Sequence, residues 1–127
     1  MILRSFWKVI LWLITITVLS CMPVHVIMKY PFLNIPNLDK AVHFFMYSFF
    51  SFFLIQGIVK YRPTDKHELF VIITLIISAA YGYLMEIAQL KLFTFREGDV
   101  IDMVFNITGT LAGIIFYEII YPVVNKI

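Results

Sequence analysis

Cysteine and charged residues are both scarce in this chain of 127 residues. The single cysteine, Cys21, excludes an intrachain disulfide and any metal site built from several cysteines. Only 14% of the residues are charged, whereas a typical soluble domain carries about 25%. The formal net charge is +2 and the basic residues form no run, so nucleic acid is not expected as a partner. These absences exclude disulfide-stapled, ordinary soluble and nucleic-acid-binding proteins.

Most of the chain consists of long apolar segments. Hydrophobic residues make up 61% of the chain, and they fall in blocks near the length of about 20 residues that a membrane-spanning helix needs. The sequence therefore predicts an all-α integral membrane bundle of four transmembrane helices, forming one domain over residues 1–127. The helices are expected at about 5–22, 40–59, 69–90 and 99–124. The thirteen Phe and seven Tyr are expected mostly at lipid-facing and interfacial positions.

The first apolar block has a competing interpretation. Basic residues followed by an apolar stretch also describe a signal peptide, and the residues up to Cys21 are similar to a lipoprotein cleavage site. A retained helix is preferred because Lys8 can extend its ammonium group to the interface and so lengthen the span. Pro23 then supplies a natural stop.

The distribution of Lys and Arg predicts the orientation. Six of them lie at the two termini and in the middle turn, and four lie on the other side. The six are Arg4, Lys8, Lys60, Arg62, Lys66 and Lys126, and the four are Lys29, Lys40, Lys91 and Arg96. We therefore expect a bacterial cytoplasmic membrane protein with both termini cytoplasmic.

Polar and small residues form one stripe on each of the last three helices. Residues spaced three or four apart share a helix face. The stripes are Lys40, His43, Tyr47 and Ser51; Ala79, Gly82, Glu86 and Gln89; and Asp99, Asp102, Asn106, Gly109 and Gly113. The last two glycines form a Gly-x-x-x-Gly pattern, which lets another helix approach closely.

The polar ends of these stripes are expected on the same side of the membrane. The second helix starts there, the third ends there and the fourth starts there. Charged groups at membrane depth are costly and mark a functional site. The predicted ligand-binding residues are Lys40, His43, Glu86, Gln89, Arg96, Asp99, Asp102 and Asn106. Structural roles are predicted for Asp39, Gly82, Gly109 and Gly113.

Three other interpretations of this cluster remain open. The groups could only satisfy one another, with Arg96 clamping Glu86 or Asp102. A metal could bind His43 and the neighbouring carboxylates of Glu86, Asp99 and Asp102, but no His-Glu-x-x-His spacing supports it, and no metal or other cofactor is assigned.

A hydrolase is the third interpretation. His43 would serve as base and Glu86 or Asp102 as acid. Ser48 and Ser51 lie in an ordinary helical pattern with no activating motif. Catalytic residues therefore stay unassigned, and the sequence does not decide whether the protein is an enzyme.

The same residues carry a resemblance to a known family. Asp39-Lys40-x-x-His43-Phe44 resembles the Asp-Lys-x-x-His-Phe signature of the VanZ-like family. The later polar residues follow in that family's order, as Glu86-x-x-Gln89, Arg96-x-Gly98-Asp99-x-x-Asp102, Asn106, Gly109 and Gly113. The match spans about residues 18 to 115. Thr94-Phe95 departs from it, standing where the family commonly has a Pro-Gly turn.

The resemblance implies a small bacterial membrane protein of the cell envelope, in a family whose namesake is associated with resistance to the glycopeptide teicoplanin. We expect an outward-opening polar pocket that binds a membrane lipid, a lipid-linked envelope precursor or a lipoglycopeptide. The alternative is a metal-assisted or acid–base hydrolase that acts on a lipid-linked substrate at the same site.

Overall fold

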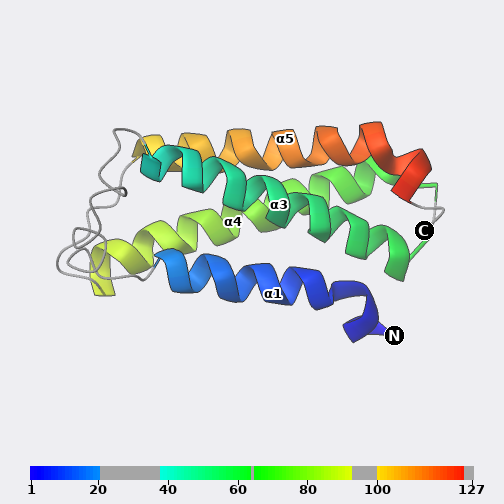
Figure 1. Ribbon diagram of the computed structural model, residues 1–127, viewed down its shortest axis with the longest axis horizontal. Coiled ribbons are helices and arrows are strands. Elements are labelled where there is room, and N and C mark those ends of the chain that lie inside the picture. Colours follow the sequence, from blue (N-terminus) through cyan, green and yellow to red (C-terminus); the bar gives the residue numbers. More distant parts are fainter. Residues whose placement is uncertain (21–37, 64, 93–99, 125–127) are drawn as a thin grey trace.

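Four long α-helices run antiparallel along one axis (Figure 1). The computed structural model describes residues 1–20, 38–63, 65–92 and 100–124. Its helices are α1 (Ile2–Ser20), α3 (Leu38–Tyr61), α4 (His67–Leu92) and α5 (Val100–Val124). Each predicted boundary lies within three residues of the observed one, and no described residue is in a strand. The predicted all-α bundle of four helices is therefore confirmed.

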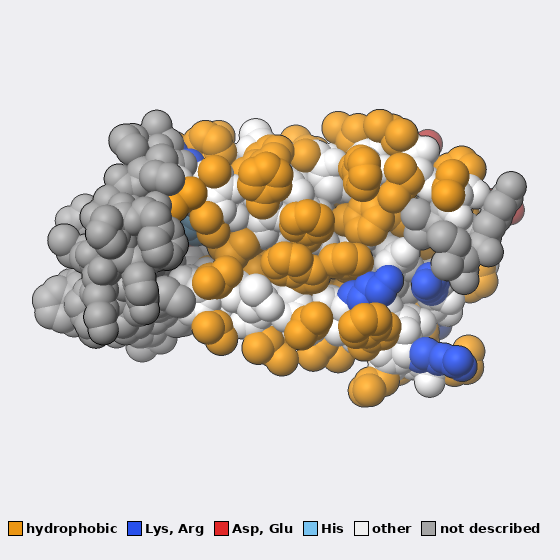
Figure 2. Space-filling model, in the orientation of Figure 1, with side chains coloured by type: hydrophobic (Ala, Val, Ile, Leu, Met, Phe, Trp, Pro, Cys, Tyr) orange, Lys and Arg blue, Asp and Glu red, His pale blue; other side chains and the backbone are white. Residues whose placement is uncertain are grey.

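The four helices are suited to a membrane by length and by surface. Each is long and apolar enough to cross a bilayer. Hydrophobic side chains cover most of the described surface on the face seen in Figure 2, and Lys and Arg gather at the end where α1 begins. Apolar helices of this length match the thickness of the hydrocarbon core of a bilayer. The chain is a multi-pass membrane protein.

Local chemistry explains where α3 ends. Arg62 precedes Pro63, and a residue before proline is disfavoured in the α conformation. The helix accordingly ends at Tyr61, with Lys60 in its last turn, where a positive charge suits the negative end of the helix dipole. A turn of only a few residues then leads into α4, which forces α3 and α4 to run antiparallel.

The closest helix pair is α3 and α5. Contacts between these two helices are the most extensive in the bundle, and α1 packs mainly on α3 (Figure 1). A side chain at Gly109 would collide with the backbone of Phe44, and one at Gly113 would collide with the backbone of Ser48. The predicted Gly-x-x-x-Gly approach is therefore confirmed, and its partner is α3.

Aromatic rings fill the core beside that contact. Tyr47, Phe50 and Tyr117 are fully buried and are exceptions to the expectation that Phe and Tyr mostly face lipid or the interface; other rings, such as Phe45 and Phe116, are exposed. Tyr47 packs edge-on against Phe50, which in turn contacts Tyr81 of α4. These rings fill volume between the helices beside the close approach of α3 to α5.

The inward face of α4 is rotated relative to the predicted stripe. Ala79 is exposed, whereas Ser78 and Thr74 are completely buried. The buried positions 74, 78, 82 and 86 repeat every four residues, and position 79 falls outside that repeat. The predicted stripe was therefore wrong at its inner end and right at Gly82, Glu86 and Gln89, all of which are buried.

Candidate functional site

The candidate site lies close to one end of the bundle, the left end in Figure 1. His43 is five residues into α3, Asp102 is two residues into α5, and Glu86 is six residues from the end of α4. At a rise of about 1.5 Å per residue, these positions are about 3–9 Å from their helix ends. All three side chains are buried.

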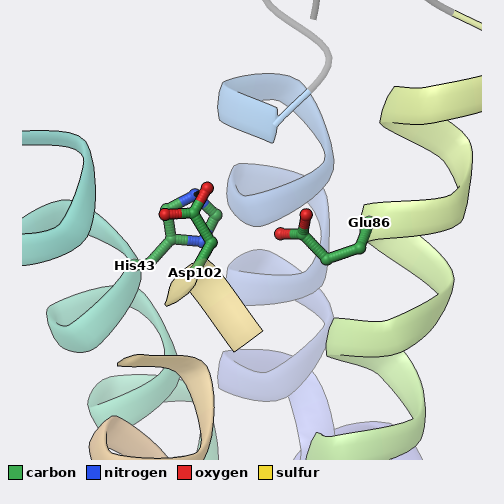
Figure 3. Close-up of side chains that lie close together, drawn as sticks. All are labelled: His43, Glu86 and Asp102. Atoms are coloured by element: carbon green, nitrogen blue, oxygen red, sulfur yellow. Dashed lines mark ion pairs between the residues drawn. The ribbon is translucent and has the colours of Figure 1, made fainter. Parts of the chain in front are cut away.

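Figure 3 shows the three side chains converging from three different helices. One donor atom from each of His43, Glu86 and Asp102 lies within 4.8 Å of the other two. The imidazole Nε2 of His43 is 3.8 Å from Oδ2 of Asp102. The structure therefore brings together one imidazole and two carboxylates, as the coincidence of helix ends predicts.

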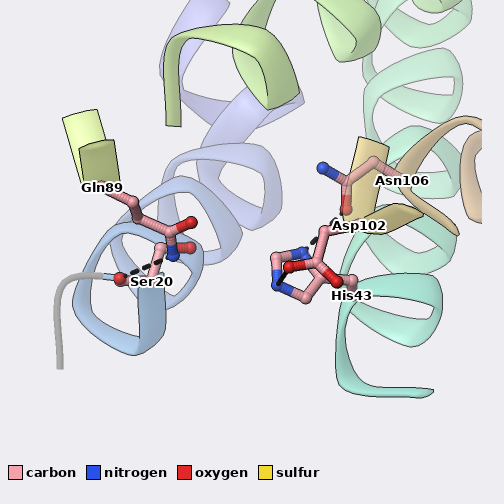
Figure 4. A network of polar contacts seen from close by, with 5 residues as sticks. All are labelled: Ser20, His43, Gln89, Asp102 and Asn106. Carbon is pink, nitrogen blue, oxygen red and sulfur yellow. Dashed lines mark hydrogen bonds and ion pairs between the residues drawn. The ribbon is translucent and has the colours of Figure 1, made fainter. Parts of the chain in front are cut away.

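Asn106 fixes the orientation of the imidazole. His43 Nδ1 lies 2.9 Å from Asn106 Oδ1, one turn beyond Asp102 on α5 (Figure 4). An amide oxygen only accepts, so Nδ1 carries the proton and donates it. The other ring nitrogen, Nε2, is thereby directed at the carboxylate of Asp102.

Gln89 has a different neighbour from the one expected. It is buried, and its amide nitrogen donates to the backbone carbonyl of Ser20 at 2.9 Å, which joins the end of α4 to the end of α1 (Figure 4). A carbonyl in the last turn of a helix lacks an intrahelical partner, and this hydrogen bond supplies one. Gln89 as a ligand contact stays a prediction.

The remaining predicted residues divide into those that the structure describes and those that it does not. Lys40 is half-buried in the first turn of α3, three residues before His43. Arg96, Asp99 and the side chain of Asp39 lie outside the described residues. The predicted ion pair of Arg96 with Glu86 or Asp102 includes a residue outside the described part of the chain, so it stays a prediction.

The sequence places Tyr47 on a polar stripe but does not predict that it lies beside Gly82 at the site. A Cβ at Gly82 would lie 3.2 Å from Asn106 Nδ2 and 3.5 Å from Tyr47 Oη. The missing side chain at Gly82 thus leaves space for one polar atom of α5 and one of α3, at a position one turn from Glu86. The shared stripe positions of Gly82 and Tyr47 were the available signal, but spacing alone does not show which partner a glycine faces.

Two serines that could have served as nucleophiles are engaged in helix packing. Ser48 Oγ donates to the carbonyls of Phe44 and Gly109, at 2.8 and 2.9 Å. Ser51 Oγ is 3.1 Å from the Ser48 carbonyl and 3.0 Å from that of Thr110. Both hydroxyls tie α3 to α5, so the chemistry of the site rests on its imidazole, carboxylate and amide groups.

A second histidine–carboxylate contact lies at the opposite end of the bundle. His67, at the start of α4, is 3.2 Å from Glu118 Oε1 and packs edge-on against Tyr121. Both members of the pair are partly exposed, with side-chain exposures of 29% and 42%. This pair has no third ligand among the described residues, which makes it a natural comparison for the buried cluster.

The arrangement can perform three kinds of chemistry. The carboxylates accept hydrogen bonds from hydroxyl or amide groups, and the imidazole can exchange a proton through Nε2. Together they also form a mixed nitrogen and oxygen donor set for a cation. Burial strengthens each of these interactions, because the effective dielectric constant is lower than in water.

Comparison with known proteins gives one finding. The family model described as VanZ/LLP1 matches residues 2–121 of the chain. Neither the curated proteins nor the solved structures contain a match. The matched region includes α1, α3, α4 and every residue of the cluster.

Proposed function

Because the chain belongs to the VanZ/LLP1 family, we propose that it is a cell-envelope membrane protein whose buried cluster binds the polar head of a lipid-linked molecule. The observation that carries the proposal is the convergence of His43, Glu86, Asp102 and Asn106 near one end of four apolar helices. Polar groups at membrane depth are expensive and are retained for a function. A ligand with an apolar tail and a polar head matches that distribution.

The chemistry of the head group follows from the donor set. The carboxylates of Glu86 and Asp102 accept from sugar hydroxyls or amide N–H groups, and the amide of Asn106 donates or accepts. Lys40 and Arg96 contribute positive charge for phosphate. A lipid-linked cell-wall intermediate has all of these groups, and the acyl-sugar portion of a lipoglycopeptide has the hydroxyl and amide groups. Resistance to teicoplanin-type glycopeptides is the phenotype that such binding would produce.

The proposal includes a location and an orientation. The protein lies in the bacterial cytoplasmic membrane, with both termini in the cytoplasm and the cluster at the extracytoplasmic face. The excess of Lys and Arg in the terminal and middle segments supports this orientation. The face on which the cluster lies is the one where lipid-linked wall intermediates are consumed.

Binding is tested with two defined probes, an N-acetylglucosamine linked to undecaprenyl diphosphate and teicoplanin, added separately to the purified protein in detergent. Native mass spectrometry counts the bound probe in the wild type, in Asp102→Asn and in Asn106→Ala. His67→Ala serves as the control, because it alters the histidine at the other end. We expect binding of at least one probe to the wild type and to the control and its loss in the two cluster variants.

A cellular assay then distinguishes ligand binding from a purely structural role of the cluster. Teicoplanin susceptibility is measured together with membrane abundance for the same variants. The proposal expects loss of resistance while the protein still accumulates. Loss of resistance in strict proportion to loss of folded protein would reduce the cluster to a structural role.

A hydrolase is the second candidate, and the geometry of His43 favours it. The hydrogen bond of Nδ1 to Asn106 fixes the ring and leaves the lone pair of Nε2 to accept a proton, as in a general base oriented by its neighbours. His43 would take a proton from a water molecule that attacks the terminal phosphorus, and Glu86 would protonate the oxygen of the departing lipid monophosphate. Release of inorganic phosphate from undecaprenyl diphosphate by the wild type, but not by Glu86→Gln, would establish this candidate. Binding without turnover would exclude it for that substrate.

A further inference from the structure

We propose that His43, Glu86 and Asp102 bind one divalent transition-metal ion, Zn²⁺ or Mn²⁺. Imidazole nitrogen with carboxylate oxygen is a donor set that suits these ions, whereas Ca²⁺ and Mg²⁺ prefer oxygen alone. The proposal goes beyond head-group binding and does not depend on it, because ion binding is measured without lipid. The sequence assigned no metal, since ligands from three separate helices form no spacing motif.

The separations between the donor atoms fit a single ion after small movements. Ligands lie about 2.0–2.2 Å from zinc, so two of them at a tetrahedral angle are about 3.4 Å apart. His43 Nε2 and Asp102 Oδ2 are 3.8 Å apart, and all three donors lie within 4.8 Å of one another. Rotation of the two carboxylates is sufficient to close these distances. Figure 3 shows both carboxylates turned toward the same space as the imidazole.

The orientation of the imidazole is that of a metal ligand. Metal-bound histidines usually donate their second ring N–H to a neighbouring acceptor, which fixes the tautomer. Asn106 Oδ1 is that acceptor for His43 Nδ1, at 2.9 Å. In this tautomer Nε2 presents a lone pair toward Asp102 Oδ2. A cation between these two atoms would be attracted to both of them.

A second observation comes from two buried polar atoms that lie beside Gly82, one turn from Glu86. Tyr47 Oη and Asn106 Nδ2 have no hydrogen-bond partner within the part of the chain that the structure describes. Their residues are 1% and 3% exposed, and both atoms approach Gly82, one turn from Glu86 on the same face of α4. A buried donor without a partner costs about 1–3 kcal/mol. A water or an anionic oxygen on the ion would accept from both.

The charge of the three side chains is compatible with a bound divalent ion. The competing explanation is that other side chains of the protein neutralise the carboxylates. Two carboxylates and a neutral imidazole carry a formal charge of −2, which one divalent cation cancels. Lys40, half-buried at the start of α3, is a source of positive charge within the protein itself. If side chains alone balance the carboxylates, the cluster takes up no ion, so ion binding distinguishes the two accounts.

The test measures binding of the metal alone. Purified full-length protein in detergent is stripped with a chelator and dialysed against Mn²⁺, and in a second series against Zn²⁺, with no lipid added. Bound metal is counted by elemental mass spectrometry, and melting temperature is recorded with and without metal. We expect about one ion per chain and a metal-dependent rise in melting temperature, because a ligand of the folded state stabilises it.

Variants assign the ion to the cluster. Asp102→Asn and Glu86→Gln, from different helices, should lose the ion, so that either one suffices if the other does not fold. Asn106→Ala should weaken affinity by about 10–100-fold, the effect of removing a group that orients a ligand. His67→Ala, which alters the partly exposed pair with Glu118, should bind like the wild type. Wild-type binding no greater than that of both ligand variants would overturn the proposal.

Discussion

At the scale of single residues, burial distinguishes two histidine–carboxylate contacts that have similar lengths. His67 and Glu118 are 3.2 Å apart with side chains 29% and 42% exposed, whereas His43 and Asp102 are 3.8 Å apart with side chains 11% and 9% exposed. Exposed pairs contribute about 0–1 kcal/mol. Removing one member of a buried pair costs about 3–5 kcal/mol, because the other is left without compensation. The buried contact of His43 with Asp102, although longer, should therefore affect the free energy of unfolding more.

This difference predicts unequal effects of two matched truncations. His43→Ala removes the hydrogen bond to Asn106 and the contact with Asp102, and we expect it to lower the free energy of unfolding by about 3–5 kcal/mol. His67→Ala should lower it by about 1 kcal/mol or less. Chemical denaturation in detergent, followed by circular dichroism, measures both. Equal losses would show that the cluster is hydrated to the same degree as the opposite end.

Gln89 shows what residue types alone do not determine. Its spacing from Glu86 predicts the inward face of α4 correctly, since both are buried. The spacing does not predict that its amide reaches the carbonyl of Ser20 on α1, because the position of α1 depends on packing across the whole bundle. The sequence thus supplies the face of the helix, and tertiary packing selects the partner.

The structural role of Gln89 has a measurable consequence. Gln89→Ala removes a buried hydrogen bond, which contributes about 0.5–1.5 kcal/mol, and should loosen the last turn of α1. We expect faster amide hydrogen exchange near Ser20 and an unchanged affinity for N-acetylglucosamine linked to undecaprenyl diphosphate. If the affinity falls while exchange near Ser20 stays the same, Gln89 contacts the ligand, as its stripe position predicts.

At the scale of helices, the glycines determine how closely the bundle packs. Gly109→Ala would place a methyl group against the backbone of Phe44, which cannot rotate away. Such overpacking costs about 1–3 kcal/mol. At Gly82 the nearest atoms belong to the side chains of Asn106 and Tyr47, at 3.2 and 3.4 Å, and these need to move by only a few tenths of an ångström.

Gly109→Ala should therefore destabilise the protein by about 1–3 kcal/mol. Gly82→Ala should change stability by less than about 1 kcal/mol, because alanine's better helix propensity offsets a mild contact. The free energy of unfolding in detergent is the measurement for both. If the Gly82 variant is the less stable of the two, the close approach of α5 to α3 is not what limits packing.

The error on α4 has a physical origin at the same scale. Ala79 and Ser78 are both small, and hydrophobicity favours neither strongly for the inward face. The structure buries Ser78 completely and exposes Ala79, since inward positions on α4 repeat every four residues through Gly82 and Glu86. In a soluble helix the polar residue would face water. Hydrogen bonding does not account for the burial of Ser78, because its hydroxyl has no hydrogen-bond partner among the described residues. The four-residue repeat of the helix packing places Ser78 inward.

At the scale of the whole molecule, charge marks the two ends of an apolar body. The buried cluster lies where α3 and α5 begin, and exposed Arg4, Lys60 and Arg62 lie at the other end. Four crossings bring the start of α1 and the end of α5 to that same end (Figure 1). Which end faces the cytoplasm is a property of insertion, and the fold is compatible with either direction.

Orientation is decided by single-cysteine labelling in cells on a Cys21→Ser background. Asp65→Cys lies in the exposed turn between α3 and α4, and Val100→Cys lies at the exposed start of α5. The excess of basic residues at the first end predicts that an impermeant external maleimide labels Val100→Cys and leaves Asp65→Cys unmodified until the cells are opened. The opposite result would place the cluster at the cytoplasmic face. An envelope ligand would then have to reach the cluster from inside the cell, and a cytoplasmic precursor would replace the mature intermediate as the expected partner.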